Sequence, residues 1–340
     1  MKIKKTIPVL YLHTNKGFSF NEGLIINVRS IVINISTMNY DGKINIMYDW
    51  FEFSKKETSC RNAIPPGCLD HIDFKKPIKW ELKVIQPYGR CLVAKEDIKE
   101  GEILFIDYPV VTGPKQNCEP LCLGCYKQLD VSETYECSKC GWPMCGSECE
   151  DKGYHPLECE AFVASGYKPK LEDFSECNPM YESVLPLRCL LLEKKHPKKW
   201  ETLIAMESHD ELRKDTELWE TEQKNVVEFL QEKVKIKHSS ELIHRVTGIL
   251  DVNCHEVRSN IPDTKNEFRA RGIYPLCAMM SHDCSSNTHH TVMDEMVMLV
   301  LASRNIYKGT QITGTYTHLL SGTIEEKKAF KIRKIFRLCL

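Results

Sequence analysis

Hydrophobic and polar positions alternate over short distances in two separate regions of the chain. Between residues 80 and 111, apolar runs at Cys91–Ala94, Ile103–Ile106 and Val110–Val111 are separated by Gly, Pro and charged residues. After residue 270 the same pattern returns in MVMLVLASRNI and TQITGTYT. Short β-rich runs bounded by turn residues are typical of strands and hairpins. The sequence therefore predicts two groups of short strands that lie far apart along the chain.

Residues 181–252 follow a helical periodicity instead. In DELRKDTELWETEQKNVVEFLQEKV the apolar positions recur close to helical spacing, with charged residues between them, at Leu212, Trp219, Val226, Leu230 and Val234. In SSELIHRVTGIL, Ser240 is suited to be an N-cap, and the apolar stripe that follows consists of Leu242, Val246 and Ile249. We interpret both stripes as packing faces, so the chain order is strands, a cysteine-rich segment, helices and strands.

Composition and charge restrict the class of protein. The 340 residues are 42% hydrophobic and 27% charged, with a formal net charge of −1, which is ordinary for a globular protein and gives no sign of a nucleic-acid or membrane-surface partner. The longest apolar runs, such as Cys189–Leu192, are far too short to span a bilayer. The N-terminus MKIKKTIPVLYLHT begins like a signal peptide, but its apolar run is short and has no small-residue cleavage site. We therefore expect an intracellular protein without membrane contact.

Seventeen cysteines are the unusual feature of the composition, and they concentrate in residues 122–159. In an intracellular chain such cysteines indicate metal binding or reduced thiols rather than disulfides. Eight candidate ligands fall into pairs with zinc-binding spacing, enough for two tetrahedral zinc ions: Cys122 with Cys125, Cys137 with Cys140, Cys145 with Cys149, and His155 with Cys159. Because so short a segment has little apolar core, metal binding would supply much of its folding energy.

The order CxxC, CxxC, CxxxC, HxxxC resembles the MYND zinc finger, and the match covers every ligand. In that family the pairs interleave. The resemblance implies that one zinc is held by Cys122, Cys125, Cys145 and Cys149, and the other by Cys137, Cys140, His155 and Cys159. It also implies a module that binds proline-containing peptides of partner proteins.

Three blocks around this segment resemble, in order, the conserved blocks of a SET domain: GRCLVAKEDIKEGEILF, YPLCAMMSHDCSSNT and ASRNIYKGTQITGTYT. A MYND finger after the first block is typical of the SET and MYND domain (SMYD) family of protein-lysine methyltransferases, and the linking region is similar to the arthropod-type branch. The resemblance covers residues 80–336. It implies an α+β fold, in which a β-rich SET domain carries an inserted MYND zinc finger and a helical insertion.

The resemblance divides the chain into segments. We expect the N-terminal part of the SET domain at 80–117, the MYND zinc finger at 118–160, the helical insertion at 161–260 and the C-terminal part of the SET domain at 261–320. Residues 1–79 match no segment of the family, although LIINVRSIVINIS within them has the β-branched content of an edge strand. We expect an incomplete post-SET segment at 321–340, because Cys339 stands alone where the family has a C-x-C…C cluster for a third zinc.

The segment MMSHDCSSNTHH at 279–290 suggests three kinds of chemistry. A thiol nucleophile would need a base and oxyanion donors, and a metal site would need paired spacings; neither is evident around Cys284. The resemblance instead makes Ser281 and His282 part of the block that binds S-adenosylmethionine, with His282, Cys284 and Asn287 matching the family. On this interpretation, the adjacent His289 and His290 are exposed loop residues.

Further site residues also follow from the resemblance. Tyr316, in ITGTYT, matches the tyrosine whose hydroxyl lies beside the transferred methyl group and orients the reaction, in contact with the cofactor; an ordinary strand tyrosine is the alternative. Asn253 matches an asparagine that contacts the cofactor. Gly89 and Arg90 match its N-terminal cofactor loop, where a glycine permits close approach of the backbone. The implied activity is methyl transfer to lysine side chains of histone or non-histone proteins, in the nucleus and cytoplasm, with a role in transcription regulation.

Three departures favour a second hypothesis, in which the chain is a catalytically weak or inactive adaptor that recruits partners through the finger. Cys91 replaces the second glycine of the cofactor loop, Ser281 stands where many members have Asn, and the C-terminal cysteines are incomplete. A nucleic-acid-binding zinc protein is disfavoured, because acidic residues are at least as numerous as basic ones between Cys122 and Cys159.

Overall fold

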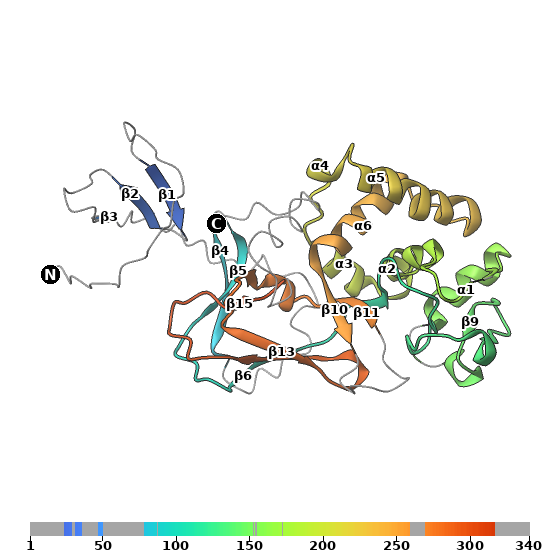
Figure 1. Ribbon diagram of the computed structural model, residues 1–340, viewed down its shortest axis with the longest axis horizontal. Helices are drawn as coiled ribbons and strands as arrows, with labels where there is room; N and C mark the ends of the chain where they lie inside the picture. The colour runs from blue at the N-terminus through green and yellow to red at the C-terminus, as the bar shows by residue number, and fades with distance from the viewer. Residues whose placement is uncertain are drawn as a thin grey trace, which may run out of the picture. The chain divides into compact units, whose positions relative to one another are not determined.

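The computed structural model of the chain describes residues 78–316, except 87, 152, 154, 172 and 259–268, together with three strands near the N-terminus. The chain divides into two compact units, Met1–Lys55 with Arg337–Leu340, and Lys56–Phe336. In the first unit, the strands pair antiparallel in the order β1 (Leu24–Val28), β2 (Ile31–Ile35) and β3 (Met47–Asp49) (Figure 1). LIINVRSIVINIS therefore forms two paired strands: β1 is the expected edge strand, and the second half of the segment forms the central strand β2. The expected post-SET segment, with Phe336 and Cys339, lies outside the described residues.

The second unit contains several small sheets rather than one large one. Its strands are β4 (Trp80–Ile85), β5 (Gly89–Ala94), β6 (Ile103–Asp107), β7 (Val111–Pro114), β8 (Tyr135–Glu136), β9 (Pro143–Met144), β10 (Cys254–Arg258), β11 (Arg269–Ile273), β12 (Ser281–His282), β13 (Thr288–Val292), β14 (Met298–Ala302) and β15 (Thr313–Gly314). They pair as β4-β5, β8-β9, β10-β11-β7, β13-β14-β6 and β12-β15. Strands from before and after the cysteine-rich segment thus share sheets, which confirms the two predicted strand groups.

The helices of this unit lie between the two strand groups in sequence. They are α1 (His155–Ser165), α2 (Val184–Lys195), α3 (Pro197–Ile204), α4 (Asp210–Arg213), α5 (Glu217–Glu222), a π-helical segment (Gln223–Lys233) and α6 (Ser240–Asn253). Helix α6 leads directly into β10 (Figure 1), so the expected helical insertion 161–260 also contains a strand. No helix in the described parts of the chain is long and apolar enough to cross a membrane.

Two helix predictions need correction. The N-cap of α6 is Ser239, whose hydroxyl accepts a hydrogen bond from the Leu242 amide at 3.3 Å, and not Ser240. The stripe that starts at Leu212 is interrupted, because Asp215 adopts a left-handed conformation (φ 61°) between α4 and α5. Leu212 is consequently 54% exposed, whereas Val226, Leu230 and Val234 are buried as expected.

The cysteine-rich segment shares one hydrophobic core with the helices and strands. Trp142, from the turn before β9, is fully buried and packs against Phe162 of α1 at 5.0 Å between ring centroids. Its other neighbour is Tyr181, in edge-to-face contact at 5.3 Å, just before α2. Aromatic pairs of this geometry add to the free energy gained by burial. The segment is therefore packed as part of this unit.

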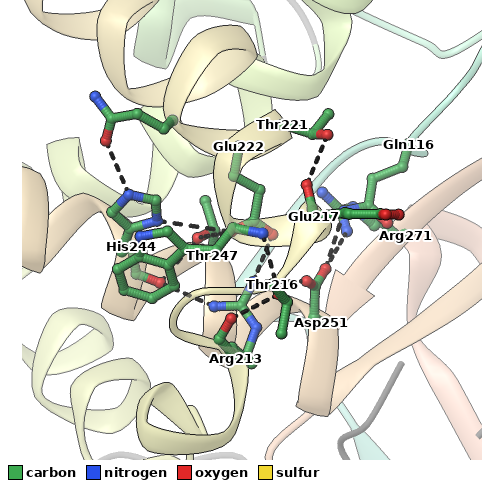
Figure 2. A network of polar contacts seen from close by, with 12 residues as sticks. Gln116, Arg213, Thr216, Glu217, Thr221, Glu222, His244, Thr247, Asp251 and Arg271 are labelled. Atoms are coloured by element: carbon green, nitrogen blue, oxygen red, sulfur yellow. Dashed lines mark hydrogen bonds and ion pairs between the residues drawn. The ribbon is translucent and has the colours of Figure 1, made fainter. Parts of the chain in front are cut away.

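A buried ionic network anchors the C-terminal end of α6 (Figure 2). Arg213 of α4 bonds Asp251 of α6 at 2.9 Å and Glu222 of α5 at 2.5 Å. Asp251 also accepts a hydrogen bond from Gln116 at 2.9 Å and forms an ion pair with Arg271 of β11 at 3.6 Å. Buried charges are tolerated when they are paired with opposite charges, and each carboxylate and guanidinium of this network faces at least one opposite charge. The network holds the last turn of α6, and with it Asn253, against the β10-β11-β7 sheet.

Asp107, at the end of β6, holds the backbone turn that precedes the MMSHDC segment. One of its carboxylate oxygens accepts hydrogen bonds from the amides of Leu276 and Cys277, each at 2.8 Å. The side chain is buried, and burial raises the pKa of this carboxyl from the ordinary 3.8 to about 7. The folded state therefore binds the Asp107 proton more tightly than the unfolded chain does, and the stability this gives at low pH is lost as pH rises towards 7.

We predict that Asp107→Asn removes this pH dependence. An amide oxygen can still accept both backbone hydrogen bonds, but it does not ionise. Between pH 5.5 and 8.5 the free energy of unfolding of the wild type should fall by about 2 kcal/mol relative to the variant. Urea unfolding at both pH values measures the difference. Asp97→Asn, which alters an exposed carboxylate that accepts from the Lys308 amide, is the control; an equal shift for Asp97→Asn would contradict this account.

Candidate functional site

Two segments that are far apart in sequence are joined at the centre of the candidate site. Strand β12 pairs with β15 in parallel, with Ser281 opposite Thr313 and His282 opposite Gly314. The pairing continues past β12, since the Asp283 amide donates to the Gly314 carbonyl at 2.9 Å. This brings the MMSHDC segment beside ITGTYT, the two segments in which the sequence placed cofactor and catalytic residues.

The side chain of Asn287 locks this pairing. Its Oδ1 accepts from the Thr313 amide at 2.8 Å, and its Nδ2 donates to the Gln311 carbonyl at 2.8 Å. Its own amide donates to the Thr313 hydroxyl at 3.2 Å. Asn287 is only 9% exposed, and a buried amide that lost these partners would be left with a desolvation penalty. Asn287 thus acts as a structural clamp between the two segments.

Tyr316 lies next to His282. The Tyr316 amide donates to His282 Nδ1 at 3.0 Å, and the two rings lie 5.3 Å apart between centroids. The Tyr316 hydroxyl donates to the carbonyl of Met280. Burial, together with the nearby thiols of Cys91 and Cys277, raises the pKa of this hydroxyl, so that it remains a protonated donor at neutral pH.

Cys284 and His282 are in contact, but the hydrogen bonding of the His282 ring excludes a catalytic thiol–imidazole dyad. Cys284 Sγ lies 3.4 Å from His282 Nε2. His282 Nδ1 accepts a hydrogen bond from a backbone amide, so the proton of the neutral ring is on Nε2. An Nε2 that already carries its proton cannot take the proton of the thiol, and His282 is therefore not a base for Cys284.

Cys91 of the N-terminal cofactor loop contacts Ser281 of β12. Cys91 is fully buried, and its Sγ donates to the Gly89 carbonyl at 3.4 Å and accepts from the Ser281 hydroxyl at 3.7 Å. Ser281 Oγ in turn accepts from Gln311 at 2.6 Å. The two departures from the family pattern are thus in contact: the extra side chain at 91 packs against the shortened side chain at 281.

Arg90 and Asn253 converge on the segment that follows α3. The Arg90 guanidinium donates to the Ala205 carbonyl at 2.9 Å. Asn253 Nδ2 donates to the Glu207 carbonyl at 2.9 Å and to the Ile249 carbonyl at 2.8 Å. Because both N–H groups of the amide are used by the protein, Asn253 Oδ1 is the atom that remains to accept a hydrogen bond from a ligand.

All the predicted cofactor and catalytic residues therefore belong to one chain of contacts. It runs from Asn253 through residues 205–207 to Arg90, then through Cys91 to Ser281, and from His282 to Tyr316. Gly89 has a left-handed backbone (φ 74°), and a Cβ at this position would meet no atom within 4 Å. This open space beside a glycine fits a cofactor that lies against the backbone. The residues present thus fit a nucleoside cofactor with polar groups.

The metal-ligand candidates form two clusters, in the interleaved sets that the resemblance implies. Cluster 1 consists of Cys122, Cys125, Cys145 and Cys149, and cluster 2 of Cys137, Cys140, His155 and Cys159. Within each cluster the ligand atoms lie within 4.8 Å of one another. The cluster 2 residues are all buried, whereas Cys125 of cluster 1 is exposed. No cysteine in the described part of the chain forms a disulfide.

The distances inside the clusters match a tetrahedral ion. Bonds of 2.3 Å to sulfur place two thiolates of a tetrahedral zinc site roughly 3.8 Å apart. In cluster 1, Cys145 Sγ lies 3.5 Å from both Cys125 Sγ and Cys149 Sγ. In cluster 2, Cys137 Sγ lies 3.9 Å from Cys159 Sγ. The ligand atoms of both clusters are therefore spaced as a tetrahedral zinc ion requires.

Some residues of the site were not predicted, and one detail was wrong. Asp107 follows an apolar run and Arg188 lies within one. An ionisable residue in such a position indicates a buried side chain that needs a polar partner, and both side chains are buried. Glu158, between two ligand candidates, is also fully buried. His289 and His290 are exposed as expected, but they belong to strand β13 rather than a loop.

Comparisons with known proteins agree with this geometry. A SET domain profile matches residues 89–317. The chain is 28% identical over 288 residues to SET domain-containing protein SmydA-8, isoform A, of Drosophila melanogaster, covering 82% of this chain and 60% of that protein. It is 25% identical over 273 residues to histone-lysine N-methyltransferase ASHR1 of Arabidopsis thaliana, covering 73% and 51%. The chain thus spans about half to three-fifths of these relatives.

Among solved structures, the SET domain of LSMT bound to lysine and AdoHcy matches at 11% identity. The match covers 73% of this chain and 51% of that chain, with a TM-score of 0.30. A superposition of this quality adds nothing to the argument from the residues.

We predict that positions 91 and 281 are energetically coupled. Ser281→Asn should lower the free energy of unfolding by about 1–3 kcal/mol, because the larger side chain has to displace the buried Cys91 thiol. In the Cys91→Gly background the same change should cost less, with a coupling free energy of about 0.5–3 kcal/mol. A double-mutant cycle in urea measures it. Additive effects would show that the two side chains are independent.

Proposed function

Because the chain belongs to the SET domain family, we propose that it transfers a methyl group from S-adenosylmethionine to lysine side chains of protein substrates. The observation that carries the proposal is the connected set of hydrogen bonds that links Gly89, Arg90, Asn253, Ser281, His282 and Tyr316, partly through Cys91 and residues 205–207. These residues come from segments up to 227 positions apart (316 − 89). An adaptor without a cofactor would need neither the polar residues of this site nor the open space beside Gly89.

Binding of the cofactor would fall to the first five of these residues. The backbone at Gly89 would allow close approach, Asn253 Oδ1 would offer an acceptor, and Arg90 would offer a cation. Ser281 and His282 supply the facing wall. When bound, S-adenosylmethionine would supply an electrophilic methyl group on a sulfonium, so the protein needs to position the partners rather than activate a strong base.

We assign to Tyr316 the orientation of the acceptor. Its hydroxyl is held by the Met280 carbonyl and is protonated at neutral pH, so it can hydrogen-bond to an incoming amine but cannot carry a negative charge there. Its aromatic ring tolerates a cationic, methylated amine. The substrate is a protein that presents a lysine; which protein is determined by contacts outside this site.

We further propose that clusters 1 and 2 each hold a structural zinc ion and that residues 118–160 act as a MYND finger. Four ligands in each cluster leave no open coordination position, which is the arrangement of structural rather than catalytic zinc. Zinc would then stabilise a segment whose strands β8 and β9 have two residues each. By the resemblance, its partners are proline-containing peptides of other proteins.

We predict that the zinc-loaded chain binds S-adenosylmethionine in the micromolar range, about −8 kcal/mol, in a calorimetric titration. Tyr316→Phe should keep this affinity within a few-fold but reduce methyl transfer to a protein substrate by at least about tenfold, because the hydroxyl orients the amine rather than the cofactor.

Tyr307→Phe, which alters a tyrosine that is 67% exposed, is the matched control and should leave both measurements unchanged. If the folded, zinc-loaded chain failed to bind S-adenosylmethionine, the methyltransferase proposal would be lost and the adaptor hypothesis would take its place. Unchanged methyl transfer in Tyr316→Phe would overturn only the role of Tyr316.

A further inference from the structure

Arg188 of α2 is fully buried and makes contacts with three separate parts of the unit. Its Nε and Nη2 form a bidentate ion pair with Glu158 of α1, at 2.7 and 2.5 Å. Its Nη1 donates to the Thr112 carbonyl on β7 at 2.9 Å. Its Nη2 also donates to the Leu123 carbonyl at 2.9 Å, inside the Cys122–Cys125 turn of cluster 1. The guanidinium thus connects both metal clusters with the β10-β11-β7 sheet.

Glu158 extends this contact to a ligand of cluster 2. Glu158 Oε1 lies 3.3 Å from His155 Nδ1, and both side chains are 0% exposed. The other ring nitrogen, His155 Nε2, lies 3.4 Å from both Cys137 Sγ and Cys140 Sγ. A hydrogen bond from Nδ1–H to the carboxylate leaves the lone pair on Nε2, which is the atom that faces the cluster. Carboxylate–histidine pairs of this kind orient histidine ligands towards bound metal.

We propose that Glu158, held in place by Arg188, is a positioning residue for metal binding at cluster 2. Through the Leu123 and Thr112 carbonyls, Arg188 also links occupancy of that cluster to the turn of cluster 1 and to β7. The inference rests on the proposed zinc binding and does not depend on methyl transfer.

A second ion pair between the same two helices provides a matched control. Lys195 of α2 bonds Glu160 of α1 at 2.5 Å, and the two side chains are 47% and 70% exposed. Glu160 follows Cys159 in the chain, but no hydrogen bond or ion pair joins either side chain to a ligand atom among the described residues. An ion pair that only docks α1 on α2 would act alike at Glu158 and Glu160, apart from the effect of burial. A positioning residue for His155 would change the metal site itself.

The experiment compares the full-length wild type, Glu158→Gln and Glu160→Gln. Each protein is loaded with zinc, and release of the ion to a competing chelator is measured; each is also prepared with Co²⁺, whose visible spectrum distinguishes four sulfur ligands from three sulfurs and one nitrogen. We expect Glu158→Gln to weaken binding of one of the two zinc ions by about 10- to 100-fold. The altered Co²⁺ spectrum should be that of the S₃N site. Glu160→Gln should match the wild type.

Because Glu158→Gln leaves Arg188 without its charged partner in the core, that variant could fail to fold. The double variant Glu158→Gln/Arg188→Met removes both charges and tests the same point. It should fold, lose the S₃N ion first, and also release the four-sulfur ion more readily, since the bond to the Leu123 carbonyl is gone.

The outcomes separate this proposal from the one on which it rests. A wild type that holds fewer than two zinc ions would refute zinc binding at the clusters. A wild type with two ions, together with a folded Glu158→Gln or double variant whose S₃N site is as tight as in Glu160→Gln, would refute only the positioning role.

Discussion

The side-chain amide of Asn287 forms two hydrogen bonds with the backbone of the facing segment. It accepts from the Thr313 amide and donates to the Gln311 carbonyl. Strands β12 and β15 have two residues each, which is too few to hold a parallel pairing by their own ladder. The antiparallel pair β13-β14 lies between β12 and β15 in the chain, so β12 and β15 pair only after this hairpin has brought them together. The buried amide supplies the additional hydrogen bonds, and the contacts of Ser281, His282 and Tyr316 depend on this pairing. Ser281 faces Gln311, His282 faces Tyr316, and Cys91 reaches Ser281 only because the pairing holds β12 in place.

The surrounding structure supports this centre from three directions. Asp107 holds the turn before Met280, the network of Arg213 and Asp251 holds the end of α6 at Asn253, and Arg188 holds the cysteine-rich segment on β7. Each is a buried ionisable group with several hydrogen-bond partners, and such groups specify one arrangement more strictly than apolar contacts do, at a cost in desolvation. The site is therefore built from polar long-range contacts whose supporting groups are buried in one hydrophobic core, whereas the contacts of Arg90, Asn253 and Tyr316 lie at the surface.

The sequence was sufficient to predict the zinc-ligand candidates and the two groups of strands, because both depend on local spacing and on order along the chain. Spacing predicts the four ligand pairs, because a short spacer holds both members of a pair at one ion. The two interleaved sets, which the resemblance to the MYND finger implies, agree with the clusters in the structure. The strands of both groups appear at the expected places for the same local reason. The contact between Cys91 and Ser281 could not be predicted, since nothing local relates two positions 190 residues apart. Asp215 broke the expected helix through a backbone conformation that the apolar periodicity does not encode, and the roles of Glu158 and Arg188 required knowledge of what each charge faces.

The central claim is that four distant segments form one cofactor site, and amide hydrogen exchange with and without S-adenosylhomocysteine tests it most directly. The account predicts that the ligand slows exchange together in the segments around Gly89–Arg90, Asn253, Ser281–Asn287 and Thr313–Tyr316, with little change at the exposed pair Lys139–Asp151 in the cysteine-rich segment. Protection confined to one of these segments, or protection in none of them at saturating ligand, would contradict it.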